Sequence, residues 1–153
     1  TERYHHPHLG LNSRLDELQA ALLTVRLQWL ADFTARRQAI AQTYHRHIRN
    51  RYLDCLAPPP SPENHVYHLF VMRCRWRQQL SDHLAVRGVK TLIHYPIPIH
   101  HQAPCQSFRC DPTGLPQAES HADQCLSIPC HPHMGEADVH HVVEAINAFV
   151  PNN

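Results

Sequence analysis

Glycine and lysine are scarce in this sequence of 153 residues, and each scarcity excludes a class of site. Four glycines do not form the glycine-rich loop that cradles a phosphate in many nucleotide-binding proteins. Lys90 is the sole lysine, so any chemistry that requires a lysine amine depends on this one position. Nucleophilic catalysis is also disfavoured, because no GxSxG motif occurs and no cysteine has a histidine at a recognisable spacing.

Long apolar runs and an excess of one charge are absent as well. No run approaches the roughly 20 residues of a membrane helix, and the first residues, TERYHHPHLG, lack the basic-then-apolar plan of a signal peptide. Fourteen basic against 13 acidic residues, a formal net charge of +1, give no electrostatic case for nucleic acid. These features predict a soluble, cytoplasmic protein that binds neither membranes nor nucleic acid.

Histidine, proline and cysteine are plentiful, at 16, 13 and six residues. A domain of this size folds without disulfides, so the cysteines indicate a reducing compartment. The segment CLSIPCHPH, residues 125–133, combines the thiols and imidazoles that zinc prefers. A strand there would point neighbouring side chains to opposite faces, so free core thiols are expected at Cys105, Cys110, Cys125 and Cys130. A small Cys/His metal-binding protein remains a minor alternative.

The first half of the chain predicts a long helix over residues 13–50. Ser13 suits the N-cap and Asp16 the first turn. No glycine or proline interrupts the segment, which is either one helix or two with a slight break near Asp32. Apolar residues at spacings of three and four define one face: Leu15, Leu18, Leu22, Val25 and Trp29.

A proline-rich connector, residues 57–64, precedes an α/β unit over residues 65–150. Gly88 is placed as a helix C-terminal stop, and the last helix is expected to bury Val139, Val142, Val143, Ile146 and Phe149. The expected strands cover 65–73, 89–95 and 126–129, and the expected helices cover 76–88, 115–125 and 135–149. The predicted fold class is α/β, with helices packed on a small sheet behind the long helix.

Two segments have features of a ligand site. GLNSR, residues 10–14, precedes a helix start, and helix N-termini hold anions. HYPIPIHHQ, residues 94–102, lies where a strand leaves the sheet, a common place for ligand-binding loops. Turn and capping roles also explain both segments, so the residues alone leave the choice open.

Six ordered blocks carry a resemblance to a known family. They are GLNSRLDELQAALL (10–23), RRQAIAQTY (36–44), HVYHLFVMR (65–73), RGVKTLIHYPIPIHHQ (87–102), LPQAE (115–119) and LSIPCHPHM (126–134). The sequence resembles the C-terminal portion of the DegT/DnrJ/EryC1/StrS sugar aminotransferases, pyridoxal-phosphate enzymes of fold type I. The resemblance implies a polar lead-in over residues 1–12 and an aminotransferase C-terminal small domain over residues 13–153.

The resemblance also implies roles for individual residues. In the family, the asparagine of the GxNxR block reaches across a homodimer to the cofactor phosphate of the neighbouring subunit, which assigns cofactor binding to Asn12. Arg14, in the same block, is a candidate anion contact. The HYP block of such enzymes lies near the nucleotide-sugar cleft. The implied substrate-side residues are His94, Tyr95, His100, Tyr4 and His6.

The implied activity is amino transfer from an amino acid, with glutamate the expected donor, to a keto-sugar nucleotide. Such transfer requires a lysine that forms a Schiff base with pyridoxal phosphate. Lys90 lies in the RGVKTLIHYP block, where the family carries no catalytic residue. The chain alone is therefore expected to be inactive and free of cofactor, as an expressed piece, a proteolytic remnant or a truncated product. The alternative is a stand-alone dimerisation or regulatory module built on the long helix.

Overall fold

A three-stranded antiparallel sheet lies at the centre of the fold, with the strands in the order β1-β2-β3. The computed structural model describes residues 3–152. The elements are α1 (Glu17–Arg26), η1 (Leu27–Trp29), α2 (Leu30–His47), β1 (Asp54–Cys55), η2 (Pro62–Asn64), β2 (Phe70–Arg73), α3 (Arg77–Val86), η3 (Ile99–His101), η4 (Ala103–Cys105), α4 (Pro116–Gln124), β3 (Cys125–Ile128) and α5 (Glu136–Asn147). The mixed α/β class predicted from the sequence is confirmed.

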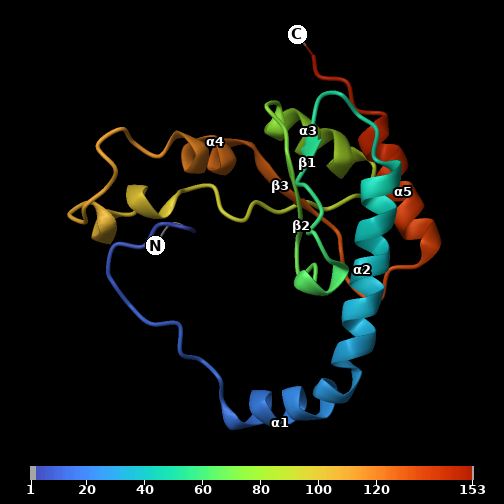
Figure 1. Cartoon of the computed structure of the whole chain (residues 1–153), viewed down its shortest axis with the longest axis horizontal. Helices are drawn as coiled ribbons and strands as arrows, with labels where there is room; N and C mark the ends of the chain where they lie inside the picture. Colours follow the sequence, from blue (N-terminus) through green and yellow to red (C-terminus); the bar gives the residue numbers. More distant parts are fainter. Residues whose placement is uncertain (1–2, 153) are drawn as a thin grey trace.

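The core lies between this sheet and the helices α2, α3 and α5, which gather beside the strands (Figure 1). Phe70 and Met72 of β2 are buried there with Leu80 and Leu84 of α3. The five apolar residues expected to point inward from the last helix are all buried, as predicted. Tyr44 of α2 is fully buried, and its hydroxyl donates to the Pro129 carbonyl at 2.7 Å. This hydrogen bond ties the helical layer to the end of β3.

The predicted long helix begins later than expected and is divided into two helices, the second of the two alternatives, with the break at residues 27–29. Helix α1 begins at Glu17, because Asp16 rather than Ser13 is the N-cap, with its carboxylate accepting from the Gln19 N–H at 2.8 Å. The α-helical pattern then gives way to the 3₁₀ turn η1 at residues 27–29, before Asp32. Helices α1 and α2 point in different directions (Figure 1). A bend therefore forms here without glycine or proline.

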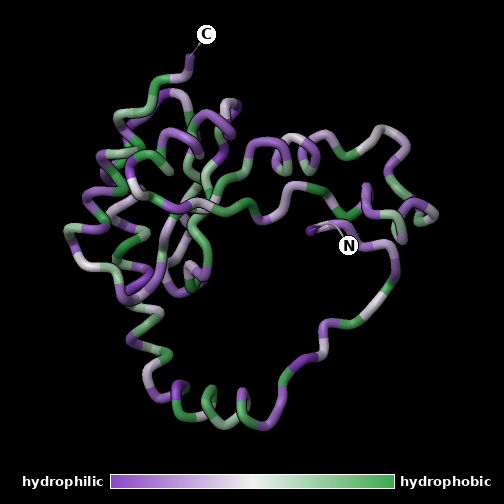
Figure 2. The backbone as a smooth tube through the Cα atoms, turned by 180° about the vertical axis from the view of Figure 1, so that it is seen from behind, coloured by the Kyte–Doolittle hydropathy of each residue, from purple (hydrophilic) through white to green (hydrophobic). Residues whose placement is uncertain are grey.

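Helix α1 lies apart from the core, as a separate stretch with many apolar positions (Figure 2). No residue of α1 is buried, whereas Ile40, Ala41 and Tyr44 of α2 are buried. Only α2, the second part of the predicted helix, is therefore packed against α5 and the sheet. Among residues 3–152, no helix is both long and apolar enough to cross a membrane.

Two predicted strands are shorter than expected. Of residues 65–73 only Phe70–Arg73 is a strand, because η2 precedes it and Tyr67 adopts a positive φ of 47°. Of residues 89–95 only Leu92 pairs, through an isolated antiparallel bridge to Ser127 on β3. The other elements of the second half are confirmed to within two residues. Gly88, at φ 75°, follows the end of α3 as predicted.

The cysteines divide between the core and the surface. Cys74, Cys125 and Cys130 are buried, whereas Cys110 is exposed, which corrects the core position expected for it. Cys105 is half-buried, and all six cysteines are unpaired. Burial raises the pKa of Cys130 to about 11, so this thiol stays protonated at neutral pH.

Candidate functional site

The candidate site combines two segments that are far apart in the sequence, and one glutamine joins them. We call residues 3–7 the N-terminal strap and residues 94–106 the arm loop. The Gln102 amide of the arm loop donates to the Tyr4 carbonyl at 2.9 Å and accepts from the His6 N–H at 3.1 Å. A single side chain thus hydrogen-bonds two backbone groups of the strap, as a neighbouring backbone strand would. Figure 1 shows the strap lying beside the arm loop, although more than 90 residues separate them in sequence.

The start of the arm loop is anchored on the sheet. His94 Nδ1 lies 2.9 Å from the hydroxyl of Ser127, a buried residue of β3. Leu92 exchanges two backbone hydrogen bonds with the same serine. The Tyr95 ring then makes edge contacts with His94, at 5.5 Å between centroids, and with Tyr4 of the strap, at 5.9 Å. These contacts leave the Tyr95 side chain largely exposed.

The far part of the arm loop is tied to α4. His100 Nε2 lies 3.1 Å from a Glu119 carboxylate oxygen, in a partly buried position. His100 and Tyr95 line a cavity of about 580 Å³, which the arm loop and α4 form with apolar side chains such as Phe108. His6 and Gln102 line a second cavity, of about 350 Å³. The arrangement offers aromatic faces and imidazoles to a ligand that has both apolar and polar parts.

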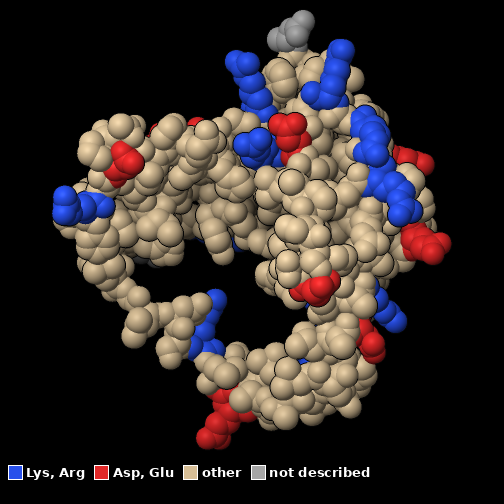
Figure 3. Space-filling view, in the orientation of Figure 1, with Lys and Arg blue, Asp and Glu red and all other residues tan. Residues whose placement is uncertain are grey.

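The predicted substrate-side residues Tyr4, His6, His94, Tyr95 and His100 therefore lie in one region of the structure. Asn12 and Arg14 do not join them. Both are exposed in the extended segment between the strap and α1, and within residues 3–152 neither side chain has a hydrogen bond or an ion pair. On the face shown in Figure 3, most basic side chains lie along α2 and at the top of the view. The part of this face that contains the arm loop and α4 is mostly uncharged.

Three residues that hold the site were not singled out from the sequence: Gln102, Glu119 and Ser127. Each lies inside a block that carries the family resemblance, which was the only signal available. Their roles depend on partners 19 to 98 positions away in sequence, so no local pattern identifies them.

The chain's residues do not fit a complete pyridoxal-phosphate site. Lys90 is exposed in the segment after α3 and lines neither of the two cavities at the arm loop. Asn12 and Arg14 are suited to one part of the cofactor, because an amide and a guanidinium donate well to a phosphate. The amine that a Schiff base requires is missing from this region.

Comparison with known proteins identifies the family. The sequence profile of the DegT/DnrJ/EryC1/StrS aminotransferase family matches residues 1–147. A protein of Saccharopolyspora erythraea named "Erythromycin biosynthesis sensory transduction protein EryC1" is 40% identical in an alignment of 152 residues that covers 96% of this chain. A protein of Streptomyces venezuelae named "dTDP-3-amino-3,4,6-trideoxy-alpha-D-glucose transaminase" is 40% identical and covers 97% of this chain.

A solved structure agrees with these sequence matches. The crystal structure of S. venezuelae DesV in complex with a ketimine intermediate has a TM-score of 0.77 and 35% sequence identity, over 98% of this chain and 41% of DesV. The chain spans about 40% of the length of the two curated relatives, at 40% and 39%. The match of the family profile to nearly every residue places the chain in the DegT/DnrJ/EryC1/StrS aminotransferase family.

Proposed function

We propose that residues 13–153, with the lead-in 1–12, are the C-terminal small domain of a pyridoxal-phosphate-dependent nucleotide-sugar aminotransferase. The observation that carries this proposal is the family match over residues 1–147, which includes both candidate ligand segments. The proposed reaction transfers an amino group from glutamate to a keto-sugar nucleotide. The name of the S. venezuelae relative, a transaminase of a dTDP-linked sugar, supports this substrate class.

In this proposal the arm loop and the strap contact the sugar nucleotide. Tyr4 and Tyr95 supply aromatic faces for stacking, and His94, His100 and His6 supply polar contacts beside them. The hydrogen bonds of Gln102 to the strap hold the two sides of this surface together before a ligand arrives. Such pre-organisation reduces the entropy lost on binding.

Asn12 and Arg14 are proposed to contact the cofactor phosphate of a neighbouring subunit in a homodimer. Their exposure and lack of partners within residues 3–152 support this role, because their donors are free for an external anion. The reacting lysine then comes from residues outside these 153, so the chain alone is inactive. The exposed leucines of α1 support the dimer, and the six unpaired cysteines support a cytoplasmic location.

The test uses the complete reading frame that contains this chain. Asn12→Ala in that protein should weaken pyridoxal-phosphate retention about 10- to 100-fold, because a hydrogen bond to a charged group is worth about 1.5–3 kcal/mol. Asn64→Ala, at another exposed asparagine, is the matched control and should retain the cofactor. Equal retention by both variants would refute the phosphate role of Asn12. A reading frame that encodes no further lysine-bearing domain would contradict the aminotransferase proposal and favour the dimerisation or regulatory module.

A further inference from the structure

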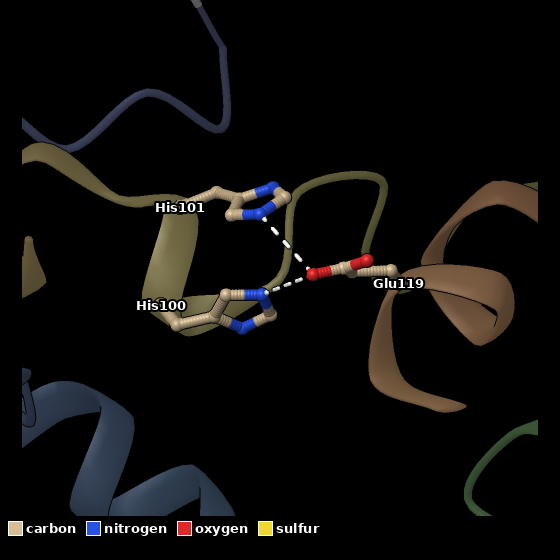
Figure 4. A group of neighbouring side chains, drawn as sticks. All are labelled: His100, His101 and Glu119. Atoms are coloured by element: carbon tan, nitrogen blue, oxygen red, sulfur yellow. Dashed lines mark hydrogen bonds and ion pairs between the residues drawn. The ribbon is translucent and has the colours of Figure 1, made fainter. Parts of the chain in front are cut away.

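Two histidines and one glutamate converge where the arm loop meets α4. His100 and His101 are consecutive residues of η3, and Glu119 lies in the first turn of α4. Both imidazoles point to the same carboxylate oxygen (Figure 4). His100 Nε2 lies 3.1 Å and His101 Nε2 lies 3.6 Å from Glu119 Oε1, and the three atoms are within 4.8 Å of one another. Among residues 3–152 this is the one group of three His, Cys, Asp or Glu side chains in such an arrangement.

These separations match those between the ligands of a small metal ion. Bonds of about 2.0–2.1 Å to a tetrahedral zinc ion place neighbouring ligand atoms about 3.3 Å apart. The two nitrogen-to-oxygen distances lie on either side of this value. The Cys125–His133 segment that first suggested zinc does not form a comparable group.

We propose that His100, His101 and Glu119 form a binding site for a divalent transition-metal ion of the zinc class. Two imidazoles and a carboxylate suit zinc and its neighbours, whereas magnesium and calcium prefer all-oxygen ligands. Three protein ligands leave at least one coordination position for water or for a ligand atom. His100 lines the larger cavity and His101 the smaller one, so the proposed ion lies between them.

The three proposed ligands differ in their exposure to solvent. The His100 side chain is 18% exposed, whereas those of Glu119 and His101 are 43% and 54% exposed, so the ion would be shielded on the side of His100 and open on the side of Glu119 and His101. A hydrogen bond between His100 and Glu119, with an ion pair between His101 and Glu119, explains the same geometry without an ion. The two explanations differ in whether zinc binds here, and the proposal does not rest on the proposed aminotransferase function.

The experiment is a zinc titration of the full 153-residue chain by calorimetry, after removal of metal with a chelator. We expect one zinc per chain whose affinity falls at least tenfold in His101→Ala and in Glu119→Gln. The second substitution keeps the size of the side chain and one acceptor oxygen. His131→Ala is the control, because His131 is also exposed and has a neighbouring histidine, His133, but lies between β3 and α5. It should bind zinc as the unsubstituted chain does, and magnesium should not compete.

Nitrogen NMR of the histidine side chains gives a second measurement that requires no substitution. Zinc at one equivalent should shift the Nε2 resonances of His100 and His101 and leave that of His131 in place. Circular dichroism of each variant establishes that it is folded. Unchanged Nε2 resonances at saturating zinc, or equal zinc affinity in the unsubstituted chain, His101→Ala and Glu119→Gln, would overturn the proposal. Neither result depends on aminotransferase activity, so this site and the proposed function fail separately.

Discussion

Charged substitutions on α1 should break self-association of the chain. Helix α1 has no buried residue, and Leu18 and Leu22 are 72% and 59% exposed. Apolar surface of this extent is costly in water, so we expect a second copy to cover it at micromolar concentration. The double substitution Leu18→Asp and Leu22→Asp places two carboxylates in that contact.

The size of the effect follows from the exposed area. Complete burial of a leucine side chain contributes about 1.5–3 kcal/mol, and roughly two thirds of that remains available at each of these positions. The two leucines therefore contribute about 2–4 kcal/mol per chain, and about 4–8 kcal/mol in a twofold dimer. At 1.4 kcal/mol per factor of ten, the double substitution should raise the dimer Kd about a thousandfold or more.

Light scattering at tens of micromolar measures the outcome. The unsubstituted chain should have the mass of a dimer, and the doubly substituted chain that of a monomer. Gln19→Asp with Gln28→Asp adds the same charge at polar positions of the same segment and should leave the dimer intact. A monomeric unsubstituted chain, or a dimer that survives both leucine substitutions, would show that the leucines of α1 do not form a contact between two copies.

Three further predictions concern the strap, the cysteines and metal. Gln102→Ala removes two hydrogen bonds to the strap, so hydrogen exchange of the His6 backbone amide, measured by NMR, should become about ten times faster. Gln106→Ala in the same loop should leave this exchange rate unchanged, and equal rates in the two variants would contradict the strap contact. Iodoacetamide should modify exposed Cys110 before the buried Cys130, as peptide mass spectrometry would detect; early reaction of Cys130 would contradict its burial. In the chain prepared without added zinc, EDTA should leave the melting temperature unchanged, since no metal is required for its core. A drop of more than about 10 °C would point to a structural ion.

Local sequence patterns predicted the second half of the fold well. Helices α3, α4 and α5 and the strand β3 lie within two residues of their expected bounds, because each has a clear apolar face or buried run and a capping signal. The positive φ of Gly88 followed from its place after a helix. The length of the strand within residues 65–73 was not predictable. The content of β-branched and aromatic residues indicates a strand, but it does not indicate which residues pair with a neighbouring strand.

The first half and the site depended on tertiary contacts. No glycine or proline marks the break at residues 27–29, and the sequence allowed a break near Asp32 only as an alternative to one helix. The bend separates the part of the helix that buries Tyr44 from the part that buries nothing. The family resemblance predicted five of the residues that lie together at the arm loop and the strap. It did not supply Gln102, whose amide joins the strap to the arm loop, because that contact exists only after the chain folds.

Borohydride reduction in the presence of pyridoxal phosphate, followed by digestion and mass spectrometry, tests most directly whether the reacting lysine lies outside this chain. The 153-residue chain alone should yield no stoichiometric adduct on Lys90 and no transamination of a keto-sugar nucleotide with glutamate. The complete reading frame should yield one adduct, on a lysine outside these residues, together with turnover. A stoichiometric adduct on Lys90 with aminotransferase turnover by the chain alone would contradict the proposal that the reacting lysine lies outside these residues.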